Sequence, residues 1–205
     1  MLKTQALAIC TLFAALAVPA HATEVALATS SAQAGYGAWQ QFNVSDIDSR
    51  SFGVEWIDNA NTNDAGFGTA LDFTFTIDAG LMGTLTVLDT GFAGDTFRIT
   101  NFGSHFGATS PVPVAFYDSN TPSIADFDAA LADSLFSRGT YVLGTGSYRI
   151  SGVLDQSVML DTATPLNSTS GGLRLTVAPV PEPSPLFLLA AGLGVLGILA
   201  RRRRD

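Results

Sequence analysis

Several acidic side chains lie close together in the second half of the chain, and they could bind a metal ion. Asp126, Asp128 and Asp133 fall within eight residues, and Asp118 precedes them. Calcium takes several oxygen ligands in flexible geometry, which makes Asp126 and Asp128 candidate ligands. On a helix, however, Asp126 and Asp133 would lie two turns apart, and such carboxylates commonly cap or solvate a surface helix. We therefore predict no metal site and no cofactor, with calcium as the alternative.

The residues available for catalysis are few. His105 is the one histidine beyond the N-terminal segment, and its nearest serines are Ser104 and Ser110. Neither serine has the Gly-x-Ser-x-Gly context of a nucleophile elbow. Glycoside hydrolysis needs two carboxyl groups facing each other across a cleft, and the glutamates before the C-terminal tail are limited to Glu24 and Glu55. We predict that the protein is not an enzyme, and a small hydrolase is an alternative.

Two kinds of surface could bind a ligand without catalysis. Exposed aromatic rings can stack on sugar rings, and Trp39, Tyr36 and Tyr117 are candidates for carbohydrate binding, whereas Trp56 suits the core. The alternative is that all four rings fill the interior. Threonines on polar strand faces could order water as an ice-binding surface does, although threonine is also a good strand former. These threonines are Thr74, Thr76, Thr84, Thr86, Thr96 and Thr100.

The C-terminal tail has three features in order: Pro181-Glu182-Pro183, an uncharged apolar run over residues 186–200, and the cluster Arg201, Arg202, Arg203 and Arg204. As a helix the run would be roughly 22 Å long, short for a membrane span of about 20 residues. Arginines favour the cytoplasmic side, so an exported chain would insert here with its bulk outside. The prolines disfavour helix before the run and leave an extended stretch open to a processing enzyme.

This order of proline-containing motif, apolar helix and arginine cluster resembles the PEP-CTERM sorting signal of Gram-negative bacteria, and Pro181, Glu182 and Pro183 match its name motif. The resemblance implies recognition by exosortase, transient insertion in the membrane, removal of the tail, and delivery to the cell surface in organisms that secrete exopolysaccharide. The alternative is an ordinary single-pass anchor. Segments 92–99, 126–134 and 136–139 also resemble the body of many small PEP-CTERM proteins, for which no activity is assigned.

The N-terminus indicates export. Lys3 precedes an apolar stretch over residues 6–18, and Ala20 and Ala22 form a small-x-small cleavage site. These features are typical of a secretory signal peptide, so we expect the mature chain to begin at Thr23. The single cysteine, Cys10, lies in this peptide, and the remaining chain has no thiol for a disulfide or a metal site.

The part of the chain between the two sorting segments is strongly acidic. Residues 23–180 contain sixteen aspartates and glutamates against five arginines, a net charge of −11, whereas the whole chain carries −8. This charge disfavours binding to nucleic acid and to anionic lipid. Neutral glycans and divalent cations are the more compatible ligands.

Alternating hydrophobicity dominates this central part. Leu71, Phe73, Phe75 and Ile77 fall on one face of a strand, with polar residues between them. Similar alternation and turn signals at spacings near ten residues predict an all-β, antiparallel β-sandwich, jelly-roll-like. The expected turns are 59–68, 78–80, 89–95, 101–103 and 144–146. The further strands we expect contain Phe52, Val54 and Trp56; Leu85 and Val87; Phe97 and Ile99; Val112, Val114 and Phe116; Tyr148 and Ile150; and Leu173, Leu175 and Val177.

One short helix and four regions complete the expected organisation. Ile124, Phe127 and Leu131 have helical spacing, and we expect a helix over residues 123–133 with Ser123 as its cap. The regions are a signal peptide (1–22), the β-sandwich domain (23–177), a linker with the Pro-Glu-Pro motif (178–185), and a transmembrane helix with its arginine cluster (186–205). We expect an exported protein without enzymatic activity in the exopolysaccharide matrix or at the cell surface, and a carbohydrate-binding module is the main alternative.

Overall fold

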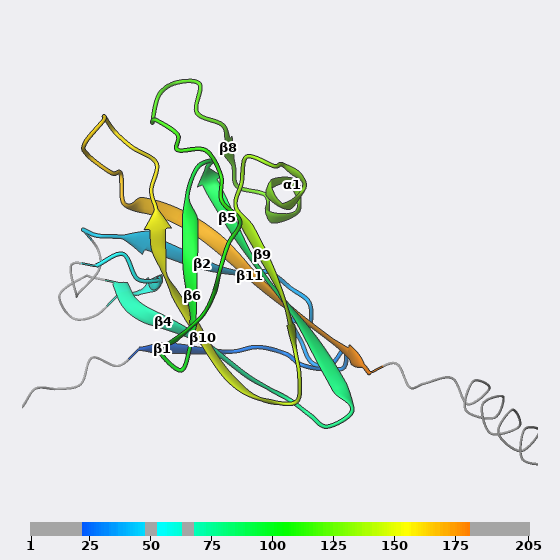
Figure 1. Cartoon of the computed structure of the whole chain (residues 1–205). Helices are drawn as coiled ribbons and strands as arrows, with labels where there is room; N and C mark the ends of the chain where they lie inside the picture. Colours follow the sequence, from blue (N-terminus) through cyan, green and yellow to red (C-terminus); the bar gives the residue numbers. More distant parts are fainter. Residues whose placement is uncertain (1–21, 48–52, 63–67, 181–205) are drawn as a thin grey trace, which may run out of the picture.

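A computed structural model describes residues 22–47, 53–62 and 68–180 (Figure 1). The signal segment before Ala22 and the tail from Pro181 onward lie outside this part. The described chain folds as an antiparallel β-sandwich with one short helix, which confirms the predicted fold class. Its elements are β1 (Thr23–Ala26), β2 (Gln40–Ser45), β3 (Ile57–Thr62), β4 (Gly68–Ile77), β5 (Leu81–Phe92), β6 (Thr96–Asn101), β7 (Ser104–Ala108), β8 (Ser123–Ile124), α1 (Phe127–Ala132), β9 (Arg138–Leu143), β10 (Gly146–Gln156) and β11 (Ser168–Pro179).

Two sheets form the sandwich. Sheet A has the order β1-β4-β10-β6-β7, and sheet B has the order β3-β2-β11-β5-β9. These pairings are antiparallel except for β1 with β4, which is parallel. The first residues of β4 also pair with β3, so β4 joins the two sheets along one side. In Figure 1 the two longest strands of sheet B, β5 and β11, run side by side.

The core lies between the sheets and receives alternate residues from both. In β4 the predicted apolar face is buried, while Asp72, Thr74 and Thr76 face outward. Trp56 lies at the centre, as expected, with its ring stacked on Phe42 at a centroid distance of 3.8 Å. Phe97 from sheet A meets both rings edge-on. Close packing of this kind holds the sheets in one relative position.

Three sequence predictions about strands are wrong. In the expected strand with Val54 and Trp56, these two residues belong to no strand, and Glu55 between them forms an isolated bridge with Val153. Residues 59–62, expected in a turn, belong to β3. Residues 112–116, expected to be a strand, form none, and the side chains of Val114 and Phe116 are about half exposed. Pro111 precedes this segment and Pro113 lies within it, and proline has no N–H for a sheet hydrogen bond.

The helix is shorter than predicted and has a different cap. Asp126 is the N-cap of α1, and its carboxylate accepts a hydrogen bond from the Ala129 amide at 2.7 Å. Ser123, expected to be the cap, instead lies in β8, which pairs with the end of β5. The first residues of the predicted helix are therefore extended, because they pair with β5, and the helix begins only at Phe127.

Candidate functional site

The candidate calcium ligands are engaged by protein donors. Asp126 caps α1, and the Asp128 carboxylate accepts hydrogen bonds from the Trp39 indole at 3.1 Å and from Arg174 at 3.0 Å. Asp133 accepts a hydrogen bond from the Leu135 amide at 2.9 Å. Over the residues that the structure describes, no group of three or more acidic, histidine or cysteine side chains could hold a metal ion.

Two of the three candidate carbohydrate-binding aromatics, Trp39 and Tyr36, are engaged by contacts within the protein. Trp39 is half-buried, stacks on Phe127 at 5.4 Å, and carries the Arg174 guanidinium at 4.2 Å from its ring. The Tyr36 hydroxyl donates to the Val177 carbonyl at 2.5 Å, which fixes it to β11. Tyr117 alone is well exposed, at 47%, in the loop before β8.

The predicted threonine array is divided between the sheets. Thr74, Thr76 and Thr100 belong to sheet A, whereas Thr84 and Thr86 belong to sheet B. Thr86 and Thr96 are buried. A flat threonine surface of the kind expected for ice binding therefore does not form from this set.

The candidate catalytic residues are also separate. His105 is exposed on β7, and within the described part of the chain no hydrogen bond joins it to Ser104 or Ser110. The Ser110 hydroxyl instead accepts a hydrogen bond from the Arg138 amide at 3.1 Å. Glu24 forms an ion pair with Arg149 at 3.2 Å.

The structure reveals a buried carboxylate pair that the sequence analysis treated only as turn residues. Asp89 lies in the buried stretch of β5, Asp95 follows the tight turn at Gly94, and the two side chains are 0% and 1% exposed. Asp95 accepts a hydrogen bond from the Val158 amide at 2.7 Å. The amides of Gly94, Asp95 and Ser137 are directed at the Asp89 carboxylate, although neither of its oxygens has a partner at full hydrogen-bond geometry.

Burial changes the protonation of this pair. Loss of hydration, together with the nearby charge of Asp95, raises the pKa of Asp89 to about 9. Burial also raises the pKa of Asp95, to about 6, although hydrogen bonds from Thr169 and Val158 oppose that rise. Asp89 is therefore neutral at physiological pH. We assign the pair a structural role in holding the β5–β6 turn, because the directed amides already surround Asp89.

A groove of about 610 Å³ crosses the outer surface of sheet A near β1. Thr74 and Thr76 of β4 and Ser147 of β10 supply hydroxyl groups to it, and Thr76 and Ser147 are hydrogen-bonded at 3.1 Å. Gln33, in the loop after β1, lines another part, and its side-chain oxygen is held by the Thr29 and Ser30 amides.

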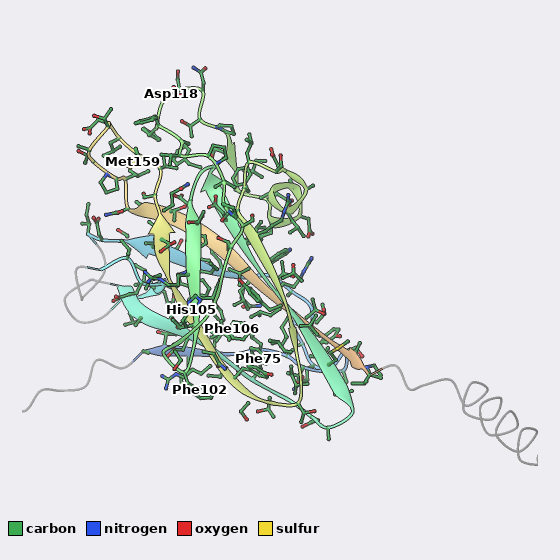
Figure 2. The ribbon with its side chains drawn as sticks, in the orientation of Figure 1. Phe75, Phe102, His105, Phe106, Asp118 and Met159 are labelled. Atoms are coloured by element: carbon green, nitrogen blue, oxygen red, sulfur yellow. The ribbon has the colours of Figure 1, made fainter. Side chains whose placement is uncertain are left out.

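An exposed phenyl ring and an ion-pair cluster complete the groove. Phe102 lies in the tight turn between β6 and β7 and is 61% exposed (labelled in Figure 2). Arg149 contacts Asp72 at 2.6 Å and Glu24 at 3.2 Å, so three strands contribute to one cluster. The bonds and charge of Asp72 raise the pKa of Arg149 above its ordinary value. The sequence analysis did not identify this groove.

The second candidate site is the tail, which follows directly on β11. Residues 179–204 match the family model described as the PEP-CTERM protein-sorting motif. The chain carries a PEP-CTERM sorting signal. The matched motif supports export and cell-surface sorting through exosortase, as the order of features in the tail predicts. The residues of the motif from Pro181 onward lie outside the described part. Among the residues that the structure does describe, none of the helices has the length and apolar character of a membrane span.

Other comparisons give no further identification. No curated protein matches the chain. One solved structure with similarity is the pre-peptidase C-terminal domain of a collagenase from Bacillus anthracis, with 10% sequence identity and a TM-score of 0.33. The match covers 78% of this chain and 98% of that domain.

Proposed function

We propose that this protein acts at the cell surface or in the exopolysaccharide matrix of a Gram-negative bacterium, in a structural or interaction role without catalysis. The observation that carries the proposal is the sorting motif at residues 179–204, which begins at the last residue of β11. The last strand of the β-sandwich thus ends where the sorting motif starts.

We further propose the processing route. The apolar run enters the membrane transiently, the arginines stay on the cytoplasmic side, and exosortase cuts near the Pro-Glu-Pro motif. The body is then released or attached outside the cell.

Replacing Pro181, Glu182 and Pro183 together by alanine tests this route. We expect the variant to accumulate as an uncut precursor in the membrane fraction, because the recognition motif is lost while the apolar run is kept. Mass spectrometry of the exported protein from an exosortase-containing host gives the readout. The wild-type protein should lack the peptide 186–205. Persistence of that peptide in exported wild-type protein would contradict processing and indicate a permanent anchor.

A further inference from the structure

Phe102 has an unusual backbone for its residue type. The loop between β6 and β7 contains two residues, Phe102 and Gly103, with φ values of 49° and 75°. A turn with positive φ at both positions favours Asn-Gly, and a bulky residue there is strained. The turn is held in place, because the Phe102 amide donates to the Arg149 carbonyl and the Arg149 amide donates to the Asn101 side chain. An exposed aromatic ring is thus fixed at the cost of backbone strain, which is a reason to look for a ligand.

The groove beside this ring has the groups that recognise a sugar. A phenyl ring offers an apolar face for the C–H side of a pyranose. The Thr74, Thr76 and Ser147 hydroxyls both donate and accept hydrogen bonds, as sugar hydroxyls require. The Gln33 oxygen is occupied by backbone amides, which leaves its nitrogen as a donor at the side of the groove.

The charges of the groove favour a neutral ligand. Arg149 is already paired with two carboxylates, Glu24 and Asp72, and Asp78 adds another negative charge. The body as a whole is also acidic, with five arginines against sixteen acidic residues in the segment 23–180. A polyanionic chain would be repelled by the carboxylates of the groove and also by the net negative charge of the whole body. The groove is open to solvent on its outer side, so its polar groups are accessible to a ligand larger than the groove itself.

We propose that this groove binds a neutral polysaccharide chain, with Phe102 as the stacking surface and Thr76, Ser147 and Arg149 as polar contacts. The inference rests on the proposed surface role, and it gives that role a ligand class. It also places carbohydrate binding on sheet A, whereas Trp39 contacts Arg174 of β11 in sheet B. Figure 2 shows Phe102 at the opposite end of the molecule from Asp118, which follows Tyr117 in the chain.

Affinity electrophoresis of the full chain in mild detergent tests the proposal, with dextran, galactomannan or soluble β-glucan in the gel and alginate as the polyanionic comparison. We expect at least one neutral polymer to retard the protein and alginate to leave its mobility unchanged. Phe102→Asn should weaken the retardation by at least about tenfold in Kd. Its melting temperature should be equal or higher, because asparagine adopts positive φ more readily. That variant therefore separates binding from folding.

Two matched variants locate the site. Phe116→Ala removes another half-exposed aromatic ring outside the groove and should keep wild-type binding. Tyr117→Ala should keep it as well. Retardation by none of the neutral polymers, retardation by alginate alone, or full binding by Phe102→Asn would overturn the inference. None of these results bears on cleavage of the tail, which is measured separately by the presence or absence of the peptide 186–205. Cleavage of a bound polymer would instead contradict the non-catalytic role.

Discussion

At the residue scale, the most unusual groups are Asp89 and Asp95. A buried carboxylate is costly when ionised, and the cost is met either by hydrogen bonds or by protonation. Asp95 obtains a bond from the Val158 amide, whereas Asp89 has amides directed at it without full hydrogen-bond geometry. The fold therefore keeps Asp89 protonated and makes stability depend on pH.

We expect the protein to become less stable as pH rises. The folded pKa values, about 6 for Asp95 and about 9 for Asp89, lie above the ordinary value of 3.8. Between pH 3.8 and the folded pKa of each aspartate, the folded state binds more protons than the unfolded state. Stability from this pair is full below pH 4 and is lost as pH rises through 6 and 9. Between pH 6 and 9 the free energy of unfolding should fall by up to about 1.4 kcal/mol per pH unit.

Urea unfolding of the full chain at several pH values measures this slope. Asp89→Asn mimics the protonated side chain, so it should flatten the slope and be more stable than the wild type at pH 8. Asp155→Asn is the control, since Asp155 is about half exposed and pairs with Arg98. A wild-type stability that rises between pH 6 and 9 would refute the assignment.

At the element scale, the strands of sheet A pass unusually close to the central tryptophan. Gly152 of β10 lies directly over the Trp56 ring, and the Trp56 amide donates to the Gly152 carbonyl at 2.9 Å. A Cβ atom at this position would lie 2.6 Å from the ring and 2.9 Å from the Arg98 carbonyl oxygen. The glycine is thus required by packing and not by a turn.

Gly152→Ala should lower the free energy of unfolding by about 1–3 kcal/mol, because the ring and the neighbouring strand must move. Denaturant unfolding provides the measurement. Gly144→Ala is the matched control in the turn that precedes β10. A Cβ there meets nothing within 4 Å, so we expect a change within about 0.5 kcal/mol. Equal effects of the two substitutions would show that the contact with Trp56 does not require glycine at position 152.

At the scale of the whole molecule, an acidic body is combined with a basic C-terminus. The four arginines after the apolar run have a different task from the five in the body, since they face the cytoplasm in the proposed route. The two ends of the chain determine the destination, while the sandwich supplies the surface that is delivered.

Replacing Arg201, Arg202, Arg203 and Arg204 together by serine tests this division. Without the positive cluster, the orientation of the apolar run is no longer fixed, so we expect less cleavage at the intact Pro-Glu-Pro motif. Immunoblots of cell fractions would show more uncut protein than in the wild type. Lysine in place of the four arginines keeps the charge and should restore cleavage. Normal cleavage of the serine variant would mean that the motif and the apolar run suffice.

The sequence by itself determined the class of fold and the sorting of the protein. Alternation in segments such as Leu71–Ile77 is a local property that shows which face of a strand is buried, and the tail motif is read as linear sequence. The absence of a strand at 112–116 has a local cause, because Pro111 and Pro113 cannot donate sheet hydrogen bonds, and alternation alone did not take this into account. The change of cap from Ser123 to Asp126 has a long-range cause, because Ser123 pairs with β5.

Only the tertiary structure decided which side chains meet. Trp39 and Tyr36 looked like exposed binding residues, but Phe127 and β11 engage them. Asp89 and Asp95 looked like ordinary turn residues, but the close packing around the β5–β6 turn buries them. Phe102 joins a groove through the pairing of β1, β4 and β10, whose residues lie far apart in sequence. Burial and proximity arise from long-range strand pairing, and no local spacing encodes them.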